Sequence, residues 1–198
     1  MKFPRTPHLP GSKATNDDIF ATPEHTDTTI YVATEKMDGS NIMMDSHGFG
    51  TRNGEPSSAE WVYPARNIWF HCGHLIPEGV TLAGELLTWR KSIAYESLPG
   101  EYMIFGAVRD GECLSWSEVC DIADCVGLPI VKEFARGTFD EVVEQSKKLI
   151  TPKIEGFVVR PVDAFPFTEY AKHVSKFVGA HHNPVAGNNG RNGFEITR

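Results

Sequence analysis

The sequence lacks any long apolar run. None of its segments approaches the roughly 18 uninterrupted apolar residues that a transmembrane helix requires. Residues 1–5 (Met-Lys-Phe-Pro-Arg) also lack the apolar stretch of a secretory signal peptide. We therefore expect no membrane association and a cytoplasmic location.

Cysteine is scarce, and its pattern argues against a disulfide framework. The four cysteines form no Cys-x-x-Cys pair, which agrees with a reducing compartment; they are Cys72, Cys113, Cys120 and Cys125. The stretch 71–74 (His-Cys-Gly-His) holds residues that could bind zinc, but nothing nearby completes a tetrahedral set. It is interpreted as the end of a packed helix, and His181-His182 as an exposed loop pair.

Positive charge is also in short supply, since the formal net charge is -7. Proteins that bind nucleic acids normally present a basic surface to the phosphates. Net charge says little about local patches, so this value does not exclude such a ligand. It predicts weak, salt-sensitive binding of polynucleotide through a small basic area.

The most informative segment is residues 35–41, which read Glu35-Lys36-Met37-Asp38-Gly39-Ser40-Asn41. Lys-x-Asp-Gly alone suits an ordinary hairpin turn, in which Asp-Gly supplies positive backbone angles. The β-branched and aromatic alternation of 28–34 predicts a strand before the lysine, and 40–46 a partner strand after the turn. Such a hairpin would hold Lys36 rigidly.

Further short segments follow this lysine in a fixed order. They are Thr51-Arg52-Asn53-Gly54, Gly84-Glu85-Leu86-Leu87, Tyr102-Met103-Ile104-Phe105-Gly106, Glu155-Gly156-Phe157-Val158-Val159-Arg160 and Lys176-Phe177-Val178. Each segment alone is a weak signal, but their joint order is a strong one.

Over about residues 28–180 these segments resemble the motifs of the covalent nucleotidyltransferases, which are RNA ligases, DNA ligases and mRNA capping enzymes. DNA ligases and capping enzymes typically carry arginine where this chain has Asn41, whereas RNA ligases typically carry asparagine. The chain thus resembles an ATP-dependent RNA ligase of a minimal phage or bacterial type without a C-terminal domain. That resemblance implies the cytoplasm of a bacterium or a phage-infected host.

The resemblance and the element order both favour an α+β fold, a nucleotidyltransferase (ATP-grasp-like ligase) domain of mostly antiparallel sheets flanked by helices. We expect an N-terminal arm (1–27) packed on the domain (28–182), and a mobile C-terminal tail (183–198). The expected helices are 57–76 interrupted by Pro64, a helix capped by Ser117 that ends near Gly127, and a capping-box helix from Thr138 to about Ile150. Further strands are expected at 80–87, 101–108, 155–160 and 170–178.

The resemblance also implies a role for each motif residue. Lys36 would attack the α-phosphate of ATP, Glu85 would hold the ribose, Phe105 would stack on adenine, and Arg52 would contact phosphate. Glu155 and Asn41 would organise Mg²⁺, with Mn²⁺ as a possible substitute. The expected catalytic residues are Lys36, Glu155, Lys176, Arg52 and Asn41; those binding the cofactor are Glu35, Lys36, Asp38, Gly39, Arg52, Glu85, Phe105, Glu155, Lys172 and Lys176.

A lysine attacks phosphorus only when it is neutral, and its ordinary pKa is about 10.4. We therefore expect nearby positive charge, from Mg²⁺, Lys176, and Lys172 or Arg52, to lower the pKa of Lys36.

The last motif departs from the family pattern, and the role of the N-terminal arm has two interpretations. The last motif has one lysine where many RNA ligases have two, so one of the two phosphate contacts is either missing or supplied by Lys172 or Ser175. In the arm, Phe3 and Leu9 are expected to pack on the domain, with the alternative that Arg5 and His8 reach a phosphate.

The resulting hypothesis is an ATP-dependent RNA ligase that seals 5′-phosphate and 3′-hydroxyl ends through a lysyl-AMP intermediate and an adenylated RNA 5′-end. Its partners would be nicked or broken RNA ends, which suits RNA repair, and a protein partner is possible but not implied. A DNA or nicked-duplex ligase remains an alternative. A nucleotide- or RNA-end-binding module that needs a partner is an alternative of another class.

Overall fold

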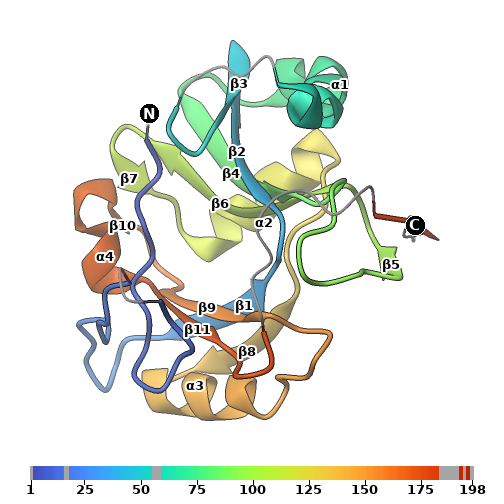
Figure 1. The fold of residues 1–198 in the computed structure, drawn as a ribbon. Coiled ribbons are helices and arrows are strands. Elements are labelled where there is room, and N and C mark those ends of the chain that lie inside the picture. The colour runs from blue at the N-terminus through green and yellow to red at the C-terminus, as the bar shows by residue number, and fades with distance from the viewer. Residues whose placement is uncertain (1, 16–17, 55–58, 183–191, 194, 197–198) are drawn as a thin grey trace.

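Two antiparallel sheets, one above the other in Figure 1, make up the body of the computed structural model. The structure describes residues 2–15, 18–54, 59–182, 192–193 and 195–196. The lower sheet has four strands in the order β11-β9-β1-β8, and the upper one has six in the order β10-β7-β6-β4-β2-β3. A short parallel pair, β5 with β12, lies apart from both. This confirms the α+β prediction.

The strands and helices have the following bounds. The strands are β1 (Tyr31–Lys36), β2 (Ser40–Asp45), β3 (Gly48–Thr51), β4 (Val80–Leu86), β5 (Ser97–Leu98), β6 (Tyr102–Arg109), β7 (Glu112–Cys113), β8 (Glu133–Gly137), β9 (Gly156–Pro161), β10 (Phe165–Pro166), β11 (Ser175–Val178) and β12 (Glu195–Ile196). The α-helices are α1 (Tyr63–Cys72), α2 (Trp116–Val126), α3 (Phe139–Lys147) and α4 (Tyr170–His173), with 3-10 turns at Glu60–Val62, Gly73–Leu75 and Phe167–Glu169. No helix among the described residues is long and apolar enough to cross a membrane.

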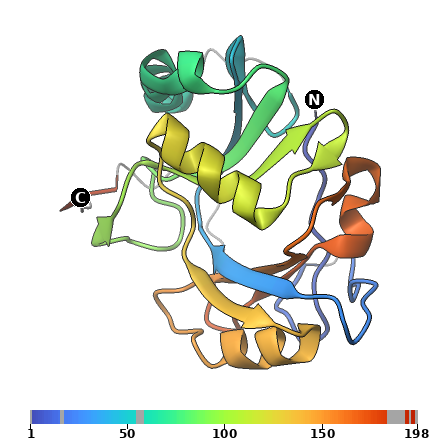
Figure 2. The same ribbon diagram turned by 180° about the vertical axis from the view of Figure 1, so that it is seen from behind.

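Strand alternation decides which face of the four-stranded sheet carries the motif residues. Tyr31 and Ala33 pack with Phe139 of α3, which covers the outer face of this sheet (Figure 2). Successive side chains point to opposite faces, so Thr34 and Lys36 point toward the other sheet.

The six-stranded sheet also has one face for the core and one for the site. Leu82 and Leu86 of β4 belong to the largest core cluster, which α1 and α2 help to close. Glu85 lies on the opposite face, where it is paired with Asn41 of β2. Polar residues of both sheets therefore face the space between them.

The expected hairpin around the Lys-x-Asp-Gly segment is wrong. β1 pairs with β8 and β9, whereas β2 pairs with β3 and β4 of the other sheet. Residues 37–39 cross from one sheet to the other. Gly39 does not have a positive φ. Glycine is required there because a Cβ would lie 2.4 Å from the backbone oxygen of Leu86.

Two expected helices differ at their starts. Pro64 lies in the first turn of α1, where proline is tolerated, and does not interrupt the helix. The N-cap of α2 is Ser115, not Ser117, because Ser115 forms the capping box with Glu118. Gly127 ends α2 in the left-handed conformation with φ 67°, as expected.

The remaining expected elements have mixed outcomes. The capping box of Thr138 and Glu141 at α3 is confirmed, and α1 ends at buried Cys72 as expected for 71–74. The expected strand 170–178 is wrong in its first half, which forms α4 before β11 begins. Strands β3 and β8 were not anticipated, since both are short and contain glycine or charged residues that disfavour strands. The two-residue strands β5, β7, β10 and β12 were not anticipated either.

The described part of the N-terminal arm has isolated bridges and turns but no helix or strand. Phe3 and Leu9 are 6% and 3% exposed, so their expected packing is confirmed. Of the tail expected to be mobile, 183–191, 194, 197 and 198 lie outside the described residues. Asn192 donates its backbone N–H to the Thr88 oxygen, and β12 pairs with β5.

Candidate active site

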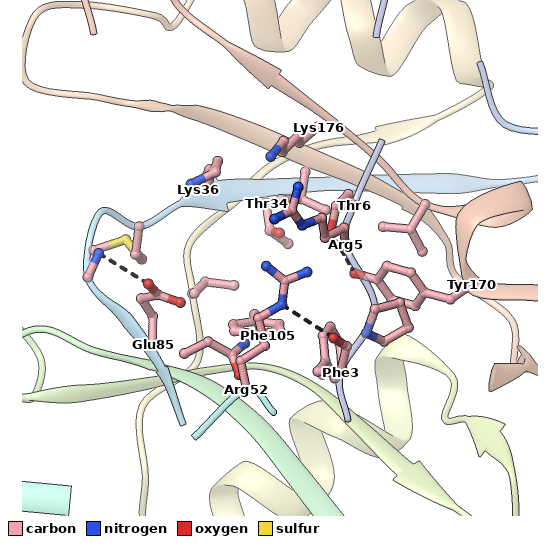
Figure 3. Close-up of a pocket in the computed structure, with 18 of the residues that line it drawn as sticks. Phe3, Arg5, Thr6, Thr34, Lys36, Arg52, Glu85, Phe105, Tyr170 and Lys176 are labelled. Carbon is pink, nitrogen blue, oxygen red and sulfur yellow. Dashed lines mark hydrogen bonds between the residues drawn. The ribbon is translucent and has the colours of Figure 1, made fainter. Parts of the chain in front are cut away.

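A cavity of about 960 Å³ lies between the two sheets, a volume that suits a nucleotide-sized ligand. Side chains from both sheets and from the N-terminal arm line it (Figure 3). The expected site residues Glu35, Lys36, Gly39, Asn41, Arg52, Glu85, Phe105 and Lys176 all belong to its lining. The fold therefore gathers residues that lie up to 141 positions apart in the sequence, Glu35 and Lys176 being the most distant pair.

Lys36 ends β1 and lies against Glu155, which directly precedes the neighbouring strand β9. The Lys36 Nζ is 2.6 Å from the Glu155 Oε1, and the Glu155 side chain is 7% exposed. Burial disfavours the ammonium, but the carboxylates of Glu155, Glu85 and Asp38 outweigh this and raise the pKa of Lys36. The expectation of a lowered pKa is wrong for the ligand-free protein, because carboxylates rather than cations are its nearest charged neighbours.

Lys176 comes to the same face from β11. Lys176 is paired with Val158 of β9, which is paired in turn with Thr34 of β1, so the three form a row across the sheet. Burial, and then the positive charge of Lys36, lower the pKa of Lys176. Two lysines thus face one cavity.

Glu85 and Asn41 form the opposite wall, on the six-stranded sheet. The Glu85 Oε1 accepts the backbone N–H of Gly39 at 3.2 Å, which ties this wall to the lysine segment. Burial raises the pKa of Glu85 to about 8, against the lowering effect of Lys36. The Oδ1 of Asn41 is buried and has no hydrogen-bond partner within the described chain.

Arg52 and Phe105 both contact the arm residue Phe3. The Arg52 Nε donates to the Phe3 carbonyl oxygen at 3.3 Å. The Phe3 ring packs edge-on to Phe105, with centroids 5.6 Å apart. Burial and nearby Arg5 lower the pKa of Arg52. The arm thus contributes to the wall that these two motif residues form.

Asp38 belongs to the lysine segment, but its carboxylate holds a neighbouring loop. The Asp38 Oδ2 accepts the backbone N–H groups of Ser92 and Ile93 at 2.8 and 2.9 Å, and the Ser92 hydroxyl at 2.5 Å. Asp38 does not line the cavity. Its geometry favours a positioning role over direct contact with a nucleotide.

Two expected phosphate ligands are not brought to the cavity. The Lys172 Nζ pairs with the Glu169 Oε1 at 2.9 Å on the exposed surface of α4. Ser175 is fully buried, and its hydroxyl donates to the Ala21 carbonyl at 2.8 Å. Neither residue lines the cavity, so neither replaces a second lysine there.

His182, interpreted from the sequence as exposed, is a half-buried residue whose side chain packs against Glu155. Its side chain is 7% exposed, and its Nε2 lies 3.6 Å from the Glu155 Oε1. The exposed-pair interpretation is wrong for this histidine and right for His181, which is exposed. The one sequence feature that could have indicated this contact is the position of His182 six residues after Lys176.

The residues present fit a hard divalent cation. The Glu155 Oε2 and the Asn41 Oδ1 are both buried, and neither has a hydrogen-bond partner among the described residues. Such oxygen atoms are the ligands that Mg²⁺ and Mn²⁺ prefer. Ligand atoms of Asp38, Glu155 and His182 also lie within 4.8 Å of one another.

The charge of the cavity differs from that of the whole chain. Its described lining carries the cations Lys2, Arg5, Lys36, Arg52, Arg160 and Lys176, and the carboxylates Glu35 and Glu85. A net charge of -7 therefore coexists with a locally basic cavity.

Comparison with solved structures shows the same fold at low sequence identity. An archaeal ATP-dependent RNA ligase matches with a TM-score of 0.57 at 18% identity, covering 83% of this chain and 49% of that one. A Naegleria gruberi RNA ligase mutant with ATP and Mn matches with a TM-score of 0.55 at 18% identity, covering 76% of this chain and 49% of that one. A putative ATP-dependent DNA ligase from Aquifex aeolicus matches with a TM-score of 0.52 at 17% identity, covering 77% of this chain and 44% of that one. The chain thus spans about half the length of these solved chains.

Sequence comparison identifies the family. No curated protein sequence matches the chain significantly. The sequence model of the RNA ligase family matches residues 29–178, which include every cavity residue of the motif segments. The chain belongs to the RNA ligase family.

Proposed function

We propose that this chain is an ATP-dependent RNA ligase that seals 5′-phosphate and 3′-hydroxyl ends through a lysyl-AMP intermediate. The observation that carries the proposal is the placement of Lys36. It faces a nucleotide-sized cavity, 2.6 Å from a buried carboxylate of Glu155 and on the same sheet face as Lys176.

In the first step, the Lys36 Nζ attacks the α-phosphorus of ATP. A phosphorus–nitrogen bond forms, the bond between the α-phosphorus and the bridging oxygen breaks, and pyrophosphate leaves with that bond's electron pair. Lys36 must lose a proton to attack, and the Glu155 Oε1 is the acceptor within reach.

The later steps transfer the AMP and then release it. The RNA 5′-phosphate attacks the lysyl-AMP phosphorus and frees Lys36, forming an adenylated 5′-end. The 3′-hydroxyl then loses its proton to solvent and its oxygen attacks the 5′-phosphorus; a phosphodiester bond forms, the phosphoanhydride bond breaks, and AMP leaves with the electron pair of that bond. Lys176 and Arg52, which both line the cavity, stabilise the negative charge that develops on phosphate oxygens in each step.

Other residues of the site orient the nucleotide or hold a metal ion. Glu85 accepts hydrogen bonds from the ribose hydroxyls, Phe105 offers an aromatic face to the adenine, and Glu35 lines the cavity beside Lys36. Glu155 and Asn41 would hold Mg²⁺ or Mn²⁺ through their unpartnered oxygens. When bound, this ion supplies positive charge that neutralises the phosphate oxygens.

The proposal that RNA is the substrate rests on membership of the RNA ligase family and on Asn41. A role in RNA repair, in a phage or a bacterium, is an extension of that proposal. Purified protein with ATP and Mg²⁺ should join 5′-phosphorylated RNA to a 3′-hydroxyl RNA end. The matched comparison is a nicked DNA duplex of the same sequence. Preference for the nicked DNA would favour the DNA ligase alternative, and binding of RNA ends without any sealing would favour the binding module.

A further inference from the structure

The last motif of this chain leaves one cation where the family pattern has two. β11 contributes Lys176 to the cavity, while Ser175 is turned to Ala21 and Lys172 pairs with Glu169 at the surface. Residues of β11 and α4 therefore do not supply the second phosphate contact.

The N-terminal arm crosses the cavity beside Lys176 and is fixed at both ends of the crossing. Phe3 donates its backbone N–H to the Arg52 oxygen at 2.8 Å, on the side of the six-stranded sheet. Lys176 donates its backbone N–H to the Pro7 oxygen at 2.8 Å, on the four-stranded sheet. Thr6 is held at 3.2 Å from the Tyr170 hydroxyl. The arm is thus tied directly to both residues expected to contact phosphate.

Arg5 lies midway along this crossing, and its side chain lines the cavity. Figure 3 shows the guanidinium groups of Arg5 and Arg52 both pointing into the space beside Lys176. Arg5 is exposed to solvent in the cavity and forms no ion pair with a carboxylate of the described chain. Like charges that line one cavity, with no carboxylate paired to Arg5 among the described residues, favour an anionic ligand, and a planar guanidinium suits phosphate oxygens.

We propose that Arg5 binds a substrate phosphate together with Arg52 and Lys176, taking the place of the second lysine of the last motif. The inference rests on the proposed ligase function and adds to it a residue outside the matched segment 29–178. The phosphate belongs either to the triphosphate of ATP or to the RNA 5′-end, since both enter the same cavity.

Three measurements on Arg5→Ala test this, with Arg5→Lys as the conservative variant and Arg66→Ala, an exposed arginine of α1, as the matched control. They are the affinity for pyrophosphate by calorimetry, the rate of AMP adduct formation from ATP, and the rate of sealing pre-adenylated RNA. A charge-assisted contact predicts a loss of about tenfold or more in Arg5→Ala, partial recovery in Arg5→Lys, and no change in Arg66→Ala.

The pattern of losses identifies the phosphate. Slower adduct formation with normal sealing of pre-adenylated RNA assigns Arg5 to the ATP triphosphate, and the reverse assigns it to the RNA end. All three quantities unchanged in Arg5→Ala would overturn the inference while the ligase function stands. If the wild-type protein neither forms an adduct nor seals RNA, the ligase proposal fails, and pyrophosphate affinity alone still tests Arg5.

Discussion

Glu85 shows how a single site residue opposes stability in the absence of ligand. It is a carboxylate on the face of β4 that meets the cavity, and burial raises its pKa to about 8. In the unfolded chain its pKa would be near 4.5, so between these values the folded protein binds more protons than the unfolded one. The free energy of unfolding therefore falls as pH rises from about 5 to 8.

We expect Glu85→Gln to remove this fall, because an amide does not ionise. Without nucleotide or metal, the variant should be more stable than the wild type at pH 8 by on the order of 1–3 kcal/mol, and by less at pH 5. Urea denaturation at both pH values measures this difference in the free energy of unfolding. Glu101→Gln, at an exposed position, is the control. An equal effect of Glu85→Gln at both pH values would contradict the assignment.

Glu85→Gln should at the same time weaken nucleotide binding, because an amide offers one acceptor oxygen where a carboxylate offers two. An apparent gain in stability coupled to a loss of ATP affinity is the signature of a residue retained for binding. Unchanged ATP affinity would show that Glu85 does not contact the nucleotide.

At the scale of elements, the site depends on how closely β9 and β11 approach. A Cβ on Gly156, the first residue of β9, would lie 1.8 Å from the Phe177 carbonyl oxygen of β11. The contact is with backbone, which cannot rotate away as a side chain does. Gly156 therefore fixes the strand spacing that places Lys176 beside Lys36.

We expect Gly156→Ala to destabilise the fold by about 3 kcal/mol or more, because the two strands must separate. Gly48→Ala in β3 is the matched control, since a Cβ there meets nothing within 4 Å. Urea denaturation compares the two. Equal midpoints for both variants would show that the β9–β11 spacing tolerates a side chain.

The arm is the second element on which the cavity depends. Phe3 packs on Phe105 and Tyr170, with ring centroids 5.6 and 5.1 Å away. Phe3→Ala should release the arm, expose it to limited proteolysis and weaken ATP binding, at a cost of about 3 kcal/mol if the packing is fully lost. Phe20→Ala, on an exposed ring of the same arm, should do none of these. Protease resistance in Phe3→Ala equal to that of the wild type would contradict this role.

Several parts of the fold followed from local sequence. The capping box at Thr138, the αL glycine at Gly127 and the longer strands β1, β2, β4, β6 and β9 depend on residues close in the chain, so the sequence alone predicted them. The assignment of β1 and β2 to different sheets depends on long-range pairing, which a short Asp-Gly turn signal does not encode. For the same reason, the sequence did not reveal that His182 packs on Glu155.

The ordered motif segments predicted which residues line the cavity better than they predicted its electrostatics. The pKa of Lys36 depends on which charges surround it in space, and Glu155 and Glu85 come from two different sheets. Lys172 shows the same limit, because its distance from the cavity is set by the short helix α4, where a strand was expected.

At the scale of the whole molecule, a net charge of -7 surrounds a basic cavity. Polynucleotide should therefore bind mainly through the cavity. If Lys2, Arg5, Arg52 and Lys176 each meet a phosphate of single-stranded RNA, log K should fall with log salt with a slope of about −3. Fluorescence anisotropy of 5′-phosphorylated RNA measures this slope, with Lys148→Ala, at the exposed C-terminal cap of α3, as a control. A slope near zero would contradict phosphate binding by the cavity.

The most direct test of the account is the mass of the intact protein after incubation with Mg²⁺ and each of the four ribonucleoside triphosphates or NAD⁺. We predict a gain of one AMP from ATP in the wild type and in Lys148→Ala, and none in Lys36→Ala. A GMP adduct would point instead to capping chemistry. No adduct from any nucleotide in the folded wild-type protein would contradict the covalent mechanism and leave nucleotide or RNA-end binding as the better account.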